Sequence, residues 1–430
     1  MDATIYFIDK NKLNESIELL IPSSKSHTIR ALLFAAMADG ESVLINPLDS
    51  ADARSCIDAC KVLGAEIIRK EDKWIVKGTG GNFPSKIKNI DVGNSGTTLY
   101  LAAGIASLSS EEIFFTGDEQ IQKRPVKPLL DSLSDLGAQI KGSDNGCAPF
   151  NIKGPITGGK TSIECPTSQY LSSLLITAPL AKEETIIEVP LLMEQPYVEM
   201  TLKWLDEQDI KYKNDNFKKF IIPGNQKYTP FKKAIPGDFS SAAFPLCAAA
   251  ITGSKLTLKG LDVTDSQGDK AVIDYLKMMN CVITSTTDTV SITGPGHSSC
   301  PEKKLIANNF DLNKTPDALP IMAVTACFAE GTTKLYNVPQ ARLKETDRIA
   351  VMHEELTKLG AEIEELDDGL IIHGGKQLKG CKVEGHGDHR VVMALAVAAL
   401  KAEGKTIITD SEAVDITYPG FFEMLDSLCN

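Results

Sequence analysis

The chain has 430 residues, of which 43% are hydrophobic and 24% are charged, so it has the size of two globular domains and is not disordered. Its formal net charge of −12 argues against a nucleic-acid partner, because nucleic-acid binding depends on lysine and arginine neutralising phosphates. Apolar stretches are too short to span a bilayer and residues 1–16 lack a signal-peptide pattern, so we expect a cytoplasmic protein with no membrane partner.

A pattern occurs six times along the chain: a cluster of Gly, Ser, Asp or Thr runs into a helix-length stretch of small apolar residues. These segments begin at Ser24, Gly93, Thr167, Gly237, Thr315 and Gly387, a period of roughly 70 to 78 residues. Because each stretch is apolar on nearly every side, the pattern predicts helices that are buried all round.

A second, more amphipathic helix follows in each repeat, and several of these helices end in Leu-Gly-Ala before a strand. The helices are predicted within 56–70, 126–142, 198–213, 270–284, 348–365 and 419–428. Their apolar spacing is helical, and the glycine is typical of a helix C-terminus. Each repeat therefore consists of two helices and several strands, which indicates an α/β protein.

Three repeats lie on each side of residue 237, which predicts two similar domains. The first comprises residues 24–237, and the second comprises residues 1–23 together with 238–430. A strand at Ile17–Leu20 precedes the first repeat and is expected to complete the second domain. A ligand cleft between the two domains is the natural expectation.

Potential anion ligands gather where the predicted helices begin. Those at the apolar helices are Lys25, Arg30, Asn94 to Thr97, Ser168, Gln169, His389 and Arg390, and those at amphipathic helices are Arg124, Lys344 and Arg348. Helix N-termini attract phosphate and carboxylate through unpaired N–H groups and a partial positive charge. One such cluster alone usually only caps a helix. Clusters that recur at the same place in several repeats, however, indicate a site for a substrate with several negative charges.

Two other patterns resemble nucleotide or metal sites but do not indicate one. GPITGGKT, from Gly154 to Thr161, matches a nucleotide-binding P-loop, but a strand rather than a helix follows, so we interpret it as a turn between strands. His386 and His389 in GHGDH have no further clustered ligand, and the ten cysteines are scattered like reduced, buried side chains. We therefore predict no metal and no organic cofactor.

Nine motifs occur in one order over residues 22–424: PSSKSHTIRALLFAA, GNSGTT, GDEQIQKRPVKPLLDSLSDLGA, TSQYLSSLLITAPL, GDFSSAAF, TPDALPIMAV, RLKETDRI, DDGLIIHG and GDHRVVMALAVAAL. In this order they resemble the 5-enolpyruvylshikimate-3-phosphate synthase family. The resemblance implies a two-domain inverted α/β barrel, each domain built of three repeats of two helices and a sheet. It also implies transfer of the enolpyruvyl group of phosphoenolpyruvate to shikimate 3-phosphate, with glyphosate acting at the phosphoenolpyruvate position. We expect the protein to be a monomer.

The resemblance assigns residues to each substrate. Those that match shikimate 3-phosphate ligands are Lys25, Ser26, Arg30, Thr167, Ser168, Gln169, Tyr197, Asp317 and Lys344. Those that match phosphoenolpyruvate ligands are Lys25, Asn94, Gly96, Arg124, Gln169, Arg348 and Arg390. The expected catalytic residues are Asp317, which faces the acceptor hydroxyl, and Glu345, which faces the methylene carbon, with Lys25 and His389 as further proton carriers.

Three positions depart from the family's pattern. Tyr100 and Ile416 stand where many relatives carry a cation, and Glu194 replaces a serine that often helps to bind the acceptor's phosphate. A carboxylate at that position is expected to repel the phosphate unless it turns away. Two alternatives stay open at this point: an enolpyruvyl transferase that acts on a different acceptor, such as a UDP-sugar, and a catalytically inactive binding protein on the same scaffold.

Overall fold

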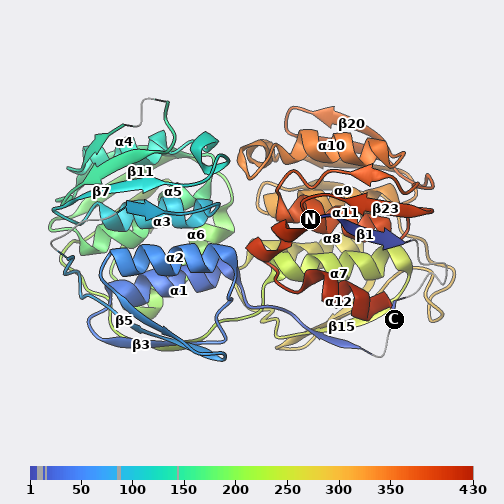
Figure 1. Ribbon diagram of the computed structural model, residues 1–430, viewed down its shortest axis with the longest axis horizontal. Helices are drawn as coiled ribbons and strands as arrows, with labels where there is room; N and C mark the ends of the chain where they lie inside the picture. Colours follow the sequence, from blue (N-terminus) through green and yellow to red (C-terminus); the bar gives the residue numbers. More distant parts are fainter. Residues whose placement is uncertain (7–12, 15–16, 85–88, 143–144, 430) are drawn as a thin grey trace. The chain divides into compact units, whose positions relative to one another are not determined.

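The computed structural model describes residues 1–6, 13–14, 17–84, 89–142 and 145–429 (Figure 1). Contacts divide it into two compact units. The first unit is Ser23–Ile235, and the second unit is Met1–Pro22 with Pro236–Asn430. Among the described residues, no helix is long and apolar enough to cross a membrane.

The first unit contains two kinds of helix. Its apolar helices are α1 (Lys25–Met37), α3 (Gly96–Ala106) and α5 (Ser168–Thr177), which are buried over most of their length. Its amphipathic helices are α2 (Ala51–Val62), α4 (Lys127–Asp135) and α6 (Gln195–Glu207). Helix α3 packs against both α1 and α5, so the apolar helices form the centre of the unit.

Three sheets accompany these helices in the described part of the first unit. Their strand orders are β14-β3-β5-β4, β6-β7-β9-β8 and β10-β11-β13-β12. The strands are β3 (Glu41–Ile45), β4 (Glu66–Arg69), β5 (Lys73–Lys77), β6 (Asn89–Asp91), β7 (Glu112–Thr116), β8 (Gln139–Lys141), β9 (Phe150–Lys153), β10 (Gly159–Cys165), β11 (Thr185–Leu192), β12 (Lys213–Asp215), β13 (Lys219–Ile222) and β14 (Lys232–Ala234). Alternate residues of β3, β5 and β7 are buried, so one face of each sheet covers the core.

The second unit repeats this plan. Its apolar helices are α7 (Phe239–Thr252), α9 (Leu319–Cys327) and α11 (His389–Ala399), and its amphipathic helices are α8 (Val272–Met278), α10 (Arg348–Lys358) and α12 (Phe421–Cys429). Its sheets are β16-β17-β15-β2, β18-β19-β21-β20 and β1-β23-β22. The strands are β1 (Ala3–Tyr6), β2 (Glu18–Leu20), β15 (Lys255–Lys259), β16 (Val282–Ser285), β17 (Thr289–Thr293), β18 (Asn309–Asp311), β19 (Thr332–Tyr336), β20 (Glu362–Leu366), β21 (Gly369–His373), β22 (Lys382–Val383) and β23 (Lys405–Ile408).

The N-terminal strands belong to the second unit. β1 pairs antiparallel with β23, and in Figure 1 the blue β1 lies beside the red β23. β2 pairs in parallel with β15, with Glu18 opposite Thr257. The strand predicted at Ile17–Leu20 therefore joins the second set of repeats.

The polar clusters that precede the apolar helices act as N-caps. Ser95 caps α3, Asp238 caps α7 and Asp388 caps α11, each accepting a hydrogen bond from a backbone N–H in the first turn. A buried helix needs such caps because its first N–H groups have no partner within the helix. Helix α9 begins differently: the 3₁₀ turn Pro316–Ala318 precedes it, and no side chain in the described part of the chain caps it.

The P-loop-like segment is a connection between strands. β9 ends at Lys153 and β10 begins at Gly159, so Lys160 and Thr161 lie in a strand. The interpretation of GPITGGKT as a turn is therefore confirmed. The cysteines are also as expected, because all ten are free thiols and seven of them are buried.

The packing of α3 against α5 depends on Gly104. A Cβ atom at this position would lie 2.3 Å from Ser173 Oγ and 2.5 Å from Thr177 Oγ1. Alanine favours a helix over glycine by about 1 kcal/mol, but overpacking a buried contact costs about 1–3 kcal/mol. We predict that Gly104→Ala lowers the free energy of unfolding by up to about 2 kcal/mol, the difference between these two effects, measured by urea denaturation.

The double variant Gly104→Ala, Ser173→Ala is the matched control for this prediction. It removes the nearest atom and should recover part of the lost stability. A single variant more stable than the wild type would contradict the close packing of these two helices.

Candidate active site

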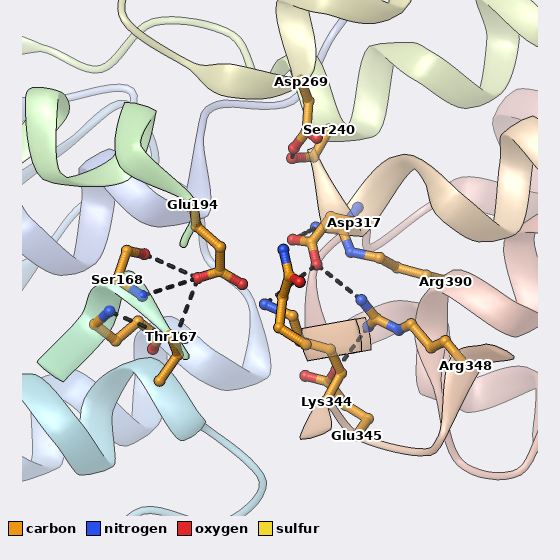
Figure 2. A network of polar contacts seen from close by, with 12 residues as sticks. Thr167, Ser168, Glu194, Ser240, Asp269, Asp317, Lys344, Glu345, Arg348 and Arg390 are labelled. Carbon is orange, nitrogen blue, oxygen red and sulfur yellow. Dashed lines mark hydrogen bonds and ion pairs between the residues drawn. The ribbon is translucent and has the colours of Figure 1, made fainter. Parts of the chain in front are cut away.

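Acidic and basic side chains meet where three helical segments of the second unit begin. Asp317 lies in the 3₁₀ turn before α9, Lys344 and Glu345 precede α10, and Arg348 and Arg390 lie in the first turns of α10 and α11. Figure 2 shows Asp317 reached by both arginines, with Lys344 and Glu345 below it. The PDALP, KETDR and DHR motifs therefore form one cluster, which we call the second-unit charge cluster.

Arg348 is the centre of this cluster. Its Nη1 lies 2.8 Å from Asp317 Oδ1, and its Nη2 lies 2.6 Å from Glu345 Oε2. Its Nε lies 2.8 Å from Asp388 Oδ2, and its side chain is only 1% exposed. Burial by itself would lower the pKa of Arg348, but Asp388, Glu345 and Asp317 raise it above its ordinary value. Arg348 therefore remains charged although it is buried.

The remaining cations of the cluster surround Asp317. Arg390 Nη2 lies 3.0 Å from Asp317 Oδ2, and Lys344 Nζ lies 4.0 Å from Asp317 Oδ1. His389 is buried beside Asp388, with 4.0 Å between its Nδ1 and Asp388 Oδ1. The charges of Lys344, Arg348 and Arg390 thus balance those of Asp317, Glu345 and Asp388. An anionic substrate that binds these cations has to replace carboxylates that now contact them.

Buried charge also lies at the start of α1 in the first unit. Arg30 Nε donates to Thr201 Oγ1 at 2.9 Å, and its Nη2 donates to the Tyr197 carbonyl at 3.1 Å. No carboxylate among the described residues pairs with Arg30, and burial lowers its pKa to about 10, so it still carries a charge at neutral pH. Such a guanidinium is suited to a carboxylate or phosphate ligand.

Lys25 and Ser26 lie beside Arg30. Lys25 Nζ forms an ion pair with Asp52 Oδ2 at 3.2 Å, and the Ser26 carbonyl accepts from Arg30 Nη1 at 3.1 Å. Asp52 was not among the residues predicted from the sequence. It lies in the first turn of α2, where an acidic residue is ordinary and carries no signal of its own.

The expected phosphoenolpyruvate ligands of the first unit form a second group. Asn94 Nδ2 donates to Asp118 Oδ2 at 2.6 Å and to Gln120 Oε1 at 2.7 Å. A Cβ atom at Gly96 would lie 2.3 Å from Arg124 Nη1, so the guanidinium rests directly on this glycine. The structure thus brings Gly96 and Arg124 together, as is necessary if both contact the same phosphoenolpyruvate molecule.

The start of α5 holds the expected acceptor ligands Thr167, Ser168 and Gln169. Glu194 Oε2 accepts from Thr167 Oγ1 at 3.2 Å, from Ser168 N at 3.1 Å and from Ser168 Oγ at 2.9 Å (Figure 2). The carboxylate does not turn away from the expected phosphate ligands, so the condition under which it would not repel the phosphate is not met in this structure. The cause is electrostatic, because an anion is stabilised at a helix N-terminus.

The other two departures lie in apolar surroundings. Tyr100 is buried in α3, where its ring meets that of Tyr170 edge to face at 5.2 Å. Ile416 is partly buried and packs against the hydrophobic core of the second unit. Both side chains therefore contribute to packing within their own unit.

The family assignment follows from comparison with known proteins. The model of the family EPSP synthase (3-phosphoshikimate 1-carboxyvinyltransferase) matches residues 10–425. A 3-phosphoshikimate 1-carboxyvinyltransferase of Acetivibrio thermocellus is 50% identical over 419 residues, which cover 97% of this chain and 96% of that protein. The chain belongs to the EPSP synthase family.

More distant relatives agree with this assignment. The 3-phosphoshikimate 1-carboxyvinyltransferase of Methanocaldococcus jannaschii is 43% identical over 415 residues, which cover 95% of this chain and 94% of that protein. The structure of EPSP synthase from Acinetobacter baumannii matches with a TM-score of 0.82 and 26% identity, and covers 99% of this chain and 98% of that chain. The predicted fold class of the EPSP synthase family is thereby confirmed.

Sequence reasoning missed two acidic residues that support the charge cluster. Asp388 lies in the DHR motif, caps α11 and binds Arg348. Glu355 is fully buried in α10; it accepts from His386 Nε2 at 2.7 Å and from the Glu384 N–H at 3.0 Å. These contacts join α10 to the segment that leads into α11.

Glu355 also belongs to a group that has suitable ligand atoms for a metal ion. Its members are Glu354, Glu355 and His386. Lys358 Nζ, however, lies 2.9 Å from Glu354 Oε1 and 2.8 Å from Glu355 Oε1, so a cation of the protein already pairs with both carboxylates. Hydrogen bonds within the protein occupy both oxygens of Glu355, and we assign this group a structural role.

The buried Asp388 carboxylate should contribute strongly to stability. Asp388→Asn leaves Arg348 buried with one fewer charged partner, so we predict a loss of about 3–5 kcal/mol in the free energy of unfolding at pH 7. Burial raises the pKa of Asp388, but Arg348 outweighs it and holds that pKa below its ordinary value. The stabilisation is therefore present above about pH 4 and is lost as the pH falls through the lower folded-state pKa.

Urea denaturation of the wild type and Asp388→Asn between pH 7 and pH 3 measures this effect. The difference in unfolding free energy should be constant at neutral pH and should narrow in acid. Asp274→Asn, which removes an exposed carboxylate paired with Lys277, serves as the control and should change stability little. Equal stability of Asp388→Asn and the wild type at pH 7 would contradict the prediction.

Proposed function

We infer that this protein is an enolpyruvyl transferase of the shikimate pathway to aromatic amino acids. It transfers the enolpyruvyl group of phosphoenolpyruvate to the 5-hydroxyl of shikimate 3-phosphate and releases phosphate. The observation that carries this conclusion is the match to the EPSP synthase family over residues 10–425. Relatives named 3-phosphoshikimate 1-carboxyvinyltransferase, up to 50% identical over nearly the whole chain, support it and disfavour an inactive homologue or a UDP-sugar acceptor.

The second-unit charge cluster supports a role in proton transfer. The reaction requires a proton at the methylene carbon of phosphoenolpyruvate while the acceptor hydroxyl loses a proton and attacks C2. Phosphate then leaves C2 as the methyl group so formed loses a proton. Asp317 faces the hydroxyl and Glu345 faces the methylene carbon, as their motifs imply, with Lys25 and His389 as further carriers. Both carboxylates contact Arg348 at 2.8 Å or less, so a substrate anion that binds Arg348 displaces one of them and frees it for proton transfer.

The cations then hold charge that develops during the reaction. Arg348 and Arg390 face phosphoenolpyruvate together with Arg124, and Lys344 and Arg30 face the acceptor. Because Arg348 and Arg390 are nearly fully buried, their charge is weakly screened by water. Preorganised groups of this kind are each worth about 10²- to 10³-fold in rate.

Replacement of the two carboxylates tests this assignment. We predict that Asp317→Asn and Glu345→Gln each lower kcat by about 10²- to 10⁴-fold, because neither amide accepts a proton. The measurement is phosphate release from phosphoenolpyruvate with shikimate 3-phosphate. Asp274→Asn and Glu362→Gln remove exposed carboxylates of the same unit and should retain full activity.

Near-normal turnover in both Asp317→Asn and Glu345→Gln would contradict the assignment of these two carboxylates as acid and base. Release of phosphate with a UDP-sugar, but none with shikimate 3-phosphate, would overturn the choice of acceptor.

We also propose that the protein acts as a cytoplasmic monomer and that the residues of both units act on one substrate pair. The active site then lies in a cleft between the domain of residues 24–237 and the domain of residues 1–23 and 238–430. The division of expected ligands between the two units supports this proposal, because Arg30 and Ser168 belong to the first and Asp317 and Lys344 to the second.

A split site predicts closure around the acceptor. Adding shikimate 3-phosphate should decrease the radius of gyration in solution X-ray scattering, because charged ligands on both domains converge on one molecule and exclude water. Shikimate, which lacks the phosphate, is the control and should produce a smaller change. An unchanged radius of gyration with saturating shikimate 3-phosphate would contradict the split site.

A further inference from the structure

A carboxylate of the protein itself occupies the start of α5. Glu194 lies between β11 and α6 and is 1% exposed. One of its oxygens, Oε2, accepts from Thr167 Oγ1, Ser168 Oγ and Ser168 N, as Figure 2 shows. These donors are the ones expected to bind the phosphate of the acceptor.

The position suits an anion for two physical reasons. Helix α5 has ten residues, and its first N–H groups have no partner within the helix, so its N-terminus carries a partial positive charge. Two hydroxyl groups and one backbone N–H converge on a single oxygen, as they would on an oxygen of a phosphate. Glu194 satisfies this subsite with an internal anion.

The backbone of Glu194 is in a conformation that side chains rarely adopt. Its φ is 57° and its ψ is 37°, in the left-handed region that favours glycine. Such a conformation persists only where surrounding contacts hold it. The hydrogen bonds from Thr167 and Ser168 are contacts of this kind, together with the backbone bonds from Met193 N to the Cys165 carbonyl and from Tyr197 N to the Glu194 carbonyl, so loss of the side-chain bonds would weaken the restraint on residue 194.

Release of Glu194 would also affect another expected acceptor ligand. Helix α6 begins at Gln195, and the carbonyl of Tyr197 in its first turn accepts from Arg30 Nη2 at 3.1 Å. A change at Glu194 is therefore three residues away from a hydrogen bond that orients Arg30.

We propose that Glu194 is an internal competitor for the acceptor-phosphate subsite of this enzyme. Shikimate 3-phosphate binds only to molecules in which the Glu194 carboxylate has left Thr167 and Ser168, because two anions cannot share the same donors. The apparent affinity is then the intrinsic affinity of the open subsite multiplied by the fraction of molecules in which the subsite is open. Residue 194 thereby sets the affinity for the phosphorylated acceptor; the identity of that acceptor rests on the proposed function above.

Two substitutions remove the internal anion in different ways. Glu194→Gln keeps the shape of the side chain, and Glu194→Ser shortens it. Both should bind inorganic phosphate more tightly than the wild type by about tenfold or more, measured by calorimetry, since a charged hydrogen-bond partner no longer competes. In the phosphate-release assay, the KM for shikimate 3-phosphate should fall to a similar extent, while kcat and the KM for phosphoenolpyruvate stay within about twofold.

Matched controls separate this effect from a general change in charge. Glu188→Gln removes an exposed carboxylate of β11 that pairs with Lys160 at 2.9 Å, and it should bind phosphate like the wild type. The double variant Glu194→Ser, Ser168→Ala removes a donor of the subsite and should lose the gain seen in Glu194→Ser. Thermal denaturation identifies any variant that fails to fold.

Unchanged or weaker phosphate binding in folded Glu194→Gln or Glu194→Ser would overturn the proposal. So would a gain that persists in the double variant, because phosphate would then bind elsewhere. If no form of the protein releases phosphate with shikimate 3-phosphate, the proposed function fails. Calorimetry with inorganic phosphate would still decide the role of Glu194, because it requires no turnover.

Discussion

A buried helix has to satisfy the N–H groups of its first turn, and much of this structure follows from that constraint. The apolar helices lie in the core, where water cannot provide partners, so polar residues precede them in the sequence. Ser95, Asp238 and Asp388 meet the need as N-caps. The same constraint collects polar and charged side chains at one end of each helix, where anions are also favoured.

The two units use this constraint in different ways. In the second unit, Asp388 caps α11 and also binds Arg348, so the cap takes part in the charge cluster that contains Asp317 and Glu345. In the first unit, Glu194 fills the start of α5 from a neighbouring segment. In both cases an internal carboxylate neutralises a positive site while no substrate is bound. In the proposed mechanism, substrate binding is therefore an exchange of anions, in which the strength of the internal contacts limits affinity.

The sequence predicted the repeats well because their signal is local. Apolar stretches such as the one that forms α7 have few alternatives to a buried helix, and the strand after Gly154–Thr161 excluded a P-loop within a few residues. The motifs also placed Asp317 and Arg348 in one site, since each adjoins the start of a helical segment.

Contacts between distant segments could not be predicted in this way. Nothing near Glu194 indicates that its carboxylate bonds Thr167 and Ser168, 26 or 27 positions earlier in the chain. The packing of Tyr100 on Tyr170 likewise depends on how α3 meets α5, and Glu355 acquires its role only when residues 384–386 reach α10. Local patterns determine which side chains lie at a helix start, whereas tertiary packing determines which partners they meet.

A crystal structure of the protein with both substrates would test most directly the claim that the starts of the buried helices form the anion site. The account predicts that the phosphate of shikimate 3-phosphate contacts Thr167 and Ser168 with the Glu194 carboxylate displaced, and that phosphoenolpyruvate contacts Arg348 and Arg390. A phosphate bound away from α5, or Glu194 still bonded to Ser168 in the occupied site, would contradict it.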